Sequence, residues 1–287
     1  YDALRAYAGK SPLRFHMPGH KGKFLPVPEL MSLAPVDLTE LSPTGNLFAA
    51  GDPFDSAQAL RAERRAEDRL RELYRASQLA LGEDLDLSRQ SLGALTPSRH
   101  AETERAIAAA LLGGEPAAAS QGGGIYSYEA EHGVIQFRSG GSFYGTRLDL
   151  PVEDIEGFAE EFCRRFGYEA PLCQMENGRG VASAIQLAGE VSVANCGVEM
   201  YFEGGRLTSV SGAHVSMEGA APEPGARMTC VTALMKFLDH RNASGAVCSE
   251  VRDVRCVYQL RGASTPRLLP VWEIRTDTYT YYVDCET

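Results

Sequence analysis

The sequence predicts an α+β fold in which helices alternate with groups of short antiparallel strands. Helical stretches and strand-like segments alternate three times between residues 94 and 287. Glycine pairs such as Gly204-Gly205 fit tight hairpin turns between the strand-like segments. The composition, 44% hydrophobic and 23% charged, is ordinary for a globular protein. We therefore expect repeated helix-over-meander units, in which each helix covers one face of an antiparallel sheet.

The first 66 residues form a proline-rich arm that is followed by a long helix. Seven prolines exclude a long helix before about Asp55: Pro12, Pro18, Pro26, Pro28, Pro35, Pro43 and Pro53. From Ser56 to Leu81 the sequence is rich in Ala, Leu, Arg and Glu, which predicts one helix ending near Gly82. The predicted divisions are an arm at residues 1–66 and a helix with a polar connector at 67–93.

Three α+β units follow, at residues 94–150, 151–220 and 221–287. Thr96 is the predicted N-cap of the first helix and Gly167 ends the second. The predicted helices are Pro97–Leu112, Val152–Phe166 and Met228–Asp239. The predicted strands are Gly124–Glu129, Gly133–Ser139, Ser142–Leu148, Ala182–Leu187, Gly189–Cys196, Val198–Glu203, Arg206–His214, Val247–Leu260, Leu268–Thr276 and Thr280–Asp284.

Charge, hydropathy and cysteine content argue against several classes of function. A formal net charge of -10 and a pI near 5.2 disfavour nucleic acid and anionic membrane as partners. No run of about 18 apolar residues is present, so we expect no membrane span. The seven cysteines contain no C-x-x-C pair, so we expect no metal site. Reduced thiols are favoured, and one or two disulfides are the alternative for an exported domain.

A specific motif lies in the arm. The motif reads Leu13-Arg14-Phe15-His16-Met17-Pro18-Gly19-His20-Lys21-Gly22-Lys23. It is followed by Asp37-Leu38-Thr39-Glu40-Leu41 and by the start of a helix at Pro53 to Ala57. Residues 1–62 resemble the N-terminal arm of bacterial Orn/Lys/Arg decarboxylases, which are pyridoxal-phosphate enzymes of the aspartate aminotransferase fold. The resemblance implies pyridoxal phosphate as cofactor and a cytoplasmic location.

Decarboxylase chemistry is nevertheless not expected here, because it needs a Schiff-base lysine. The chain has four lysines, of which only Lys236 lies outside the arm. The residues before Lys236 do not match the Ser-x-His-Lys sequence of the family. We expect no cofactor, with pyridoxal phosphate as the alternative. His16, His20 and Lys21 are an alternative anion site, although a solvated turn at Pro18-Gly19 is favoured.

No catalytic constellation is expected from Glu67 onward. We interpret Gly122-Gly123-Gly124 as a loop and the acidic and histidine side chains at residues 129–132 as a solvated hairpin turn. Ser211, His214 and Asp239 have the residue types of a triad, but no nucleophile elbow surrounds Ser211. Cys230 with His240 has no supporting context either.

The C-terminal residues predict an aromatic hairpin with a turn at Thr276–Thr278. Trp272 lies on its first strand and Tyr281 and Tyr282 on its second, with Tyr279 beside the turn. A core hairpin is favoured, and an interaction surface formed by these four aromatic residues is the alternative.

Pro270, Trp272, Tyr281 and Tyr282, placed after a helix and a strand, give residues 67–287 a second resemblance. They resemble regulators of the YycH/YycI type and PepSY-like domains. This resemblance implies an extracytoplasmic, non-catalytic regulatory protein that binds a membrane sensor histidine kinase. Those regulators carry an N-terminal membrane helix, and here a decarboxylase-like arm stands in its place. We therefore predict a regulatory or binding protein acting through protein contacts, with a truncated or diverged decarboxylase as the alternative.

Overall fold

A computed structural model describes residues 53–98, 100–220, 223, 227–262 and 265–286. These residues form two compact units, each of which is described by itself. The first unit contains described residues of 94–223 and 257–269, and the second contains those of 53–93, 227–256 and 270–286. The five-part division predicted from composition stays a prediction.

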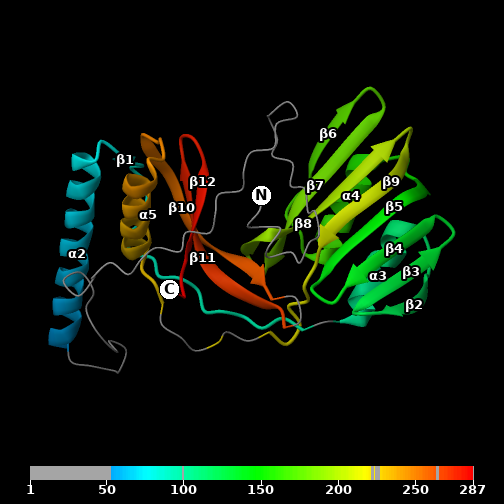
Figure 1. Ribbon diagram of the computed structural model, residues 1–287, viewed down its shortest axis with the longest axis horizontal. Coiled ribbons are helices and arrows are strands. Elements are labelled where there is room, and N and C mark those ends of the chain that lie inside the picture. Colours follow the sequence, from blue (N-terminus) through cyan, green and yellow to red (C-terminus); the bar gives the residue numbers. More distant parts are fainter. Residues whose placement is uncertain (1–52, 99, 221–222, 224–226, 263–264, 287) are drawn as a thin grey trace. The chain divides into compact units, whose positions relative to one another are not determined.

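The first unit is a curved antiparallel sheet with two helices (Figure 1). Its strands lie in the order β6-β7-β8-β9-β5-β4-β3-β2, and each neighbouring pair is antiparallel. Its elements are α3 (Ala101–Leu112), β2 (Ala117–Gly122), β3 (Ile125–Ala130), β4 (Gly133–Arg138), β5 (Ser142–Pro151), α4 (Ile155–Phe166), β6 (Leu172–Glu176), β7 (Arg179–Ala188), β8 (Val191–Glu203) and β9 (Arg206–Ala213).

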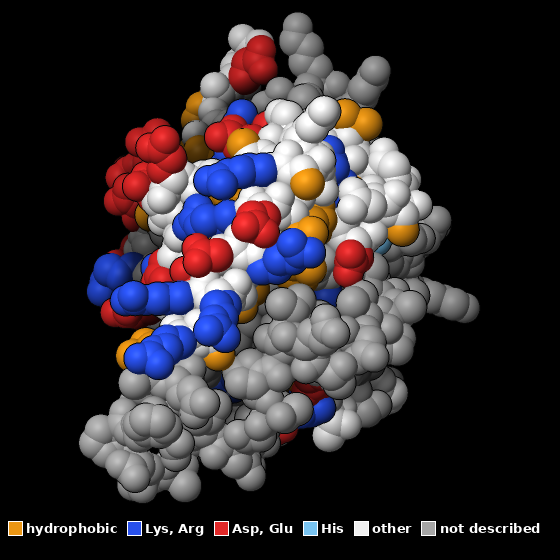
Figure 2. Space-filling view, turned by 90° about the vertical axis from the view of Figure 1, so that its left-hand side faces the viewer, with side chains coloured by type: hydrophobic (Ala, Val, Ile, Leu, Met, Phe, Trp, Pro, Cys, Tyr) orange, Lys and Arg blue, Asp and Glu red, His pale blue; other side chains and the backbone are white. Residues whose placement is uncertain are grey.

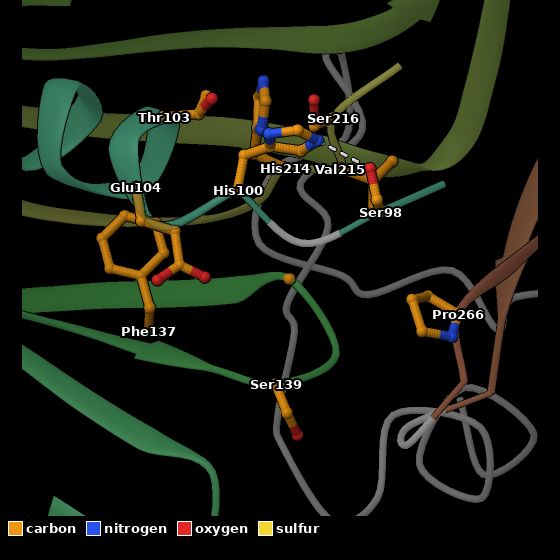
Figure 3. Close-up of a pocket in the computed structure, with 11 residues that line it drawn as sticks. Ser98, His100, Thr103, Glu104, Phe137, Ser139, His214, Val215, Ser216 and Pro266 are labelled. Atoms are coloured by element: carbon orange, nitrogen blue, oxygen red, sulfur yellow. Dashed lines mark hydrogen bonds between the residues drawn. The ribbon is translucent and has the colours of Figure 1, made fainter. Parts of the chain in front are cut away.

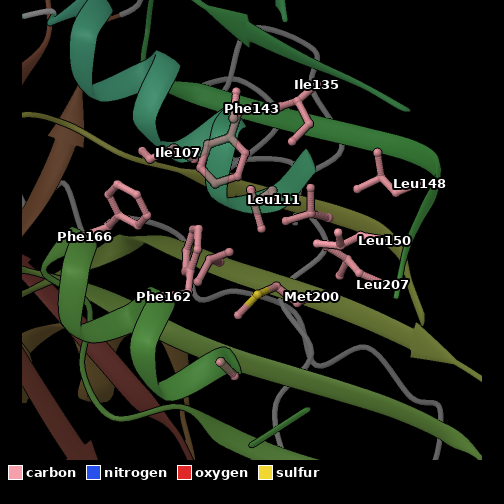
Figure 4. Packing of buried hydrophobic residues seen from close by; sticks show 14 of the residues in the cluster. Ile107, Leu111, Ile135, Phe143, Leu148, Leu150, Phe162, Phe166, Met200 and Leu207 are labelled. Atoms are coloured by element: carbon pink, nitrogen blue, oxygen red, sulfur yellow. The ribbon is translucent and has the colours of Figure 1, made fainter. Parts of the chain in front are cut away.

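Both helices pack on one core of the first unit (Figure 4). Ile107 of α3 and Phe162 of α4 meet sheet residues such as Ile135 and Met200, and all four side chains are buried. The period-two geometry of a sheet is clear in β7, where Ala182 and its alternate neighbours are buried and the residues between them are half-buried. This burial of one sheet face against two helices stabilises the unit.

The second unit packs two helices and the C-terminal hairpin around its own core. Its elements are α2 (Pro53–Ala76), β1 (Ala80–Leu81), α5 (Cys230–Ser244) and β12 (Thr280–Asp284), with parts of β10 (Glu250–Arg261) and β11 (Arg267–Thr276), which contribute residues to both units. The Tyr74 hydroxyl donates a 2.7 Å hydrogen bond to the Leu234 carbonyl, which joins α2 to α5. Strand β1 pairs in parallel with β10, and β11 pairs antiparallel with β12.

The predicted α+β class is confirmed as a mixed fold with a mostly antiparallel sheet. The second and third predicted helices are found, and Gly167 ends α4 with a left-handed φ of 70°. Gly204 and Gly205 both have positive φ between β8 and β9, so the predicted hairpin turn is confirmed. The hairpin turn that we predicted at residues 129–132 joins β3 to β4.

Several predicted boundaries are wrong for identifiable reasons. Thr96 is not an N-cap, because its hydroxyl donates to Glu223 and α3 begins only after His100. Helix α2 ends before Leu81, because Ala80 and Leu81 pair with β10. The two strands predicted at 189–203 form one strand, β8, and strands β2 and β6 were not predicted.

The described surface of α2 carries charges of both signs. Arg69 and Glu72 form an exposed pair at 3.3 Å, one helical turn apart. Figure 2 shows Arg and Lys side chains interleaved with Asp and Glu on the side of the molecule where α2 lies. Such a mixed surface has the character of a solvated helix face rather than that of a nucleic-acid site. Within the described residues, no helix is long and apolar enough to cross a membrane.

Candidate functional site

A pocket of the first unit lies between the start of α3 and the residues that follow β9 (Figure 3). Because α3 begins at Ala101, the extended residues before it line one side of the pocket. Its lining residues are Ser98, His100, Thr103, Glu104, Phe137, Ser139, Gly141, His214, Val215, Ser216 and Pro266.

Ser98 and His100 form a hydroxyl–imidazole pair in this pocket, the arrangement that activates a serine nucleophile. The Ser98 Oγ lies 2.6 Å from His100 Nε2, and Figure 3 marks this hydrogen bond. The other ring nitrogen, Nδ1, lies 3.4 Å from a carboxylate oxygen of Glu218. Serine, imidazole and carboxylate in this order are the parts of a nucleophilic triad.

The environment of these groups argues against a working triad. The Glu218 side chain is 78% exposed, so water screens its attraction for the imidazole. The Ser98 hydroxyl also lies 3.2 Å from the Glu218 backbone carbonyl, which competes for its proton. Ser98 pairs through its backbone with Ser216, so this network fixes the approach to α3. We interpret the group as a surface hydrogen-bond network.

His214, which also lines the pocket, is held in its neutral form. Its Nε2 lies 3.2 Å from the Phe166 carbonyl, so this nitrogen is the donor. Burial lowers the pKa of His214 to about 4. The ring lies 5.9 Å from that of Tyr168, whose hydroxyl donates to the Ala213 carbonyl. These contacts lock the region after β9 to the end of α4.

The residue pairs weighed from sequence lie at different places in the fold. His16, His20 and Lys21 lie outside the described residues. Ser211 lies within strand β9, not on a strand-to-helix turn, whereas Asp239 lies on α5 of the second unit. Cys230 and His240 lie ten positions apart on α5.

Lys236, the lysine weighed as a Schiff-base residue, and the possibility of a metal site remain to be placed in the structure. Lys236 is half-buried on α5. Among the described residues, no group of three metal-ligating side chains is found.

The aromatic hairpin belongs mostly to the core of the second unit. Trp272 is fully buried and lies opposite Val283, and Tyr281 is buried opposite Ile274. Tyr282 is half-buried, and its hydroxyl donates to Glu273 at 3.1 Å. Tyr279 alone among the four aromatic residues is exposed, at 46%. The hairpin thus belongs to the core, and of its four aromatic side chains only Tyr279 and Tyr282 are accessible enough to contribute to an interaction surface.

Strand β2 is one of the features that sequence reasoning missed. It pairs with β3 and, among the described strands, has no partner on its other side. All six of its residues, Ala117 to Gly122, are exposed. Alanine and glycine have low strand propensity, so the signals in the sequence were weak. They were the absence of charge from Ala117 to Gly124 and the Gly123-Gly124 pair, which forms the turn to β3.

Comparisons with known proteins give no family for this chain. No family model matches it, and neither does any curated protein. An uncharacterised protein from Eubacterium rectale is similar over 71% of this chain and 85% of its own, with 11% identity and a TM-score of 0.42. The YpeB C-terminal domain of Bacillus megaterium is similar over 66% and 94%, with 9% identity and a TM-score of 0.31. At such TM-scores neither similarity assigns a function.

Proposed function

We propose that this chain is a non-catalytic regulatory or binding protein that binds a partner protein by strand addition at the free edge of β2. The observation that carries the proposal is an edge strand of six exposed residues without a charge or a proline. In natural proteins, charged residues and prolines commonly protect edge strands against pairing with another chain. An unprotected edge is therefore suited to intermolecular pairing.

The edge offers a short regular ladder. Residues Ala117 to Ser120 pair in register with β3, from Glu129 to Tyr126. The register shifts between Ser120 and Gly122, so a bulge ends the regular part. Four residues with small side chains leave their backbone groups accessible, and main-chain hydrogen bonds supply affinity in strand addition.

The opposite edge of this sheet, strand β6, differs in chemistry. It exposes Leu172 and Met175 and ends in the charged residue Glu176. Next to it, Arg179 and Glu203 form an exposed ion pair at 2.8 Å. Because β2 carries neither charge nor bulky side chains, we expect its occupant to be an extended, uncharged, proline-free segment of the partner.

Selection of peptides tests the proposal even while the partner is unidentified. Random dodecapeptides displayed on phage are selected for binding to the immobilised full chain. The affinities of the selected peptides are then measured for the wild-type chain and for the variants Ala118→Pro and Ala119→Pro. Successive N–H groups of a strand point to opposite edges, so one of these two residues directs its N–H to the free edge. That variant keeps its stability and loses at least about tenfold in affinity, because proline removes the donor.

Strand β6 provides the matched control. Cys173→Pro and Gln174→Pro place the same change at the other edge, and we expect peptide affinity to remain at the wild-type value. Failure to select any peptide, or loss of binding in the β6 variants alone, contradicts the proposal.

The finer proposal is that the partner is a membrane sensor histidine kinase, as for YycH/YycI-type regulators. It is supported by the order of each helix before its strands and by Pro270, Trp272, Tyr281 and Tyr282. The alternative, a pyridoxal-phosphate decarboxylase, rests on the motif of residues 13–23. A borohydride-trapped adduct on Lys236 that is lost in Lys236→Arg favours the alternative, and its absence favours the binding protein.

A further inference from the structure

Two half-buried cysteines meet at the end of the C-terminal hairpin in the second unit. Cys256 lies on β10 and Cys285 directly follows β12. Both pack against the core of the second unit, and their side chains are hydrogen-bonded to each other. They are 29 positions apart in the chain, so nothing in the sequence spacing indicated the pair.

Two consecutive residues of the connector hold the two sulfurs. The Leu92 N–H donates to Cys256 Sγ at 3.4 Å, and the Ser91 side chain is hydrogen-bonded to Cys285. Ser91 is itself fixed, because it is buried and exchanges two hydrogen bonds with Met228, at 2.8 and 3.0 Å. The Leu92 N–H and the Ser91 side chain therefore position the two thiols.

The protonation behaviour of the pair separates it from the other thiols. The hydrogen bond from Cys285 lowers the pKa of Cys256, and the Leu92 N–H acts in the same direction. The same hydrogen bond raises the pKa of Cys285, so this thiol keeps its proton. Burial raises the pKa of the other five cysteines, and for Cys163, Cys196 and Cys230 the value reaches about 12.

We propose that Cys256 and Cys285 form an oxidation-sensitive dithiol that hydroperoxides convert to a disulfide. The Cys256 thiolate attacks the peroxide O–O bond, which yields Cys256 sulfenic acid and releases an alkoxide or hydroxide that takes up a proton. The Cys285 sulfur then attacks the sulfenic sulfur, and its proton leaves with the hydroxide as water. Two thiols and one hydroperoxide thus give one disulfide, one alcohol or water, and one further water.

The test uses hydrogen peroxide on the full chain, followed by alkylation and mass spectrometry of peptides. In wild type we expect a linked Cys256–Cys285 peptide and unmodified thiols elsewhere. In Cys285→Ser no resolving thiol is present, so dimedone traps the sulfenic acid on Cys256. In Cys256→Ser we expect Cys285 to stay reduced at the same peroxide concentration.

Cys173 is the matched control, because it is also half-buried but has a raised pKa. We expect dimedone to label Cys256 in Cys285→Ser at least about tenfold faster than Cys173. Circular dichroism of each variant verifies that it is folded. Equal labelling of Cys173 and Cys256, or the absence of a linked peptide in folded wild type, overturns the proposal.

Discussion

The indole N–H of Trp272 donates a hydrogen bond to the backbone carbonyl of Met228 at 3.3 Å. The same carbonyl accepts the Ser91 N–H at 2.8 Å, so one oxygen joins strand β11 to the connector. Trp272 is fully buried, and the hydrogen bond satisfies its only polar atom. Trp272 therefore contributes to the stability of the second unit through both packing and a hydrogen bond.

Replacement of Trp272 by Ala should lower the free energy of unfolding by about 3–5 kcal/mol, because it leaves a large cavity. Denaturant unfolding measures the change. Tyr279→Ala is the control, because Tyr279 is 46% exposed and should change stability by no more than about 0.5 kcal/mol. Unchanged stability of Trp272→Ala together with lost partner binding would make Trp272 an interface residue.

Two glycines that end helices should respond differently to alanine. Gly113 and Gly167 have φ of 71° and 70°, so each alanine carries a left-handed strain of about 1–2 kcal/mol. A Cβ at Gly113 also lies 2.5 Å from Leu150 Cδ1, whereas a Cβ at Gly167 meets open space. We expect Gly113→Ala to be the more destabilising by about 1–3 kcal/mol in thermal or denaturant unfolding. Equal effects would show that Leu150 moves without cost.

The buried histidine should make stability depend on pH. Because the pKa of His214 is lowered to about 4 in the folded chain, the unfolded state binds more protons between that value and its ordinary value near 6.5. The free energy of unfolding should therefore fall by about 1–3 kcal/mol as pH decreases through this window. Unfolding curves of His214→Gln should show a flatter dependence over the same range. Identical slopes for the two proteins contradict the prediction.

Ser98 should not behave as a catalytic nucleophile, despite its 2.6 Å contact with His100. The exposed Glu218 carboxylate gives the imidazole little support, so a fluorophosphonate probe should label Ser98 no faster than Ser139 in the same pocket. Rapid labelling that disappears in both Ser98→Ala and His100→Gln, but persists in Ser139→Ala, would establish a reactive serine instead.

Much of the fold was predictable where residue patterns are strong. The strand at Thr280–Asp284 and the turn before it were predicted from alternating aromatic residues and match β12 and its turn. Gly167 marked the end of α4 because few other residues adopt its backbone conformation at low cost. These signals are local, so sequence alone carries them.

Features that depend on pairing with another segment were not predictable from the residues themselves. Strand β2 is made of alanine, serine, glutamine and glycine, and it exists because β3 offers it a partner. Thr96 looks like a helix cap until Glu223, far along the chain, accepts its hydroxyl. The contact of Cys256 with Cys285 likewise follows from tertiary structure alone.

Hydrogen exchange of the full chain with and without a selected peptide tests the central claim most directly. We expect slower exchange of backbone amides in Ala117–Ser120 when the peptide is bound, with no change in β6 or around Ser98 and His100. Slower exchange confined to β6 or to the pocket, with β2 unaffected, would contradict the claim that the free edge of β2 is the binding site.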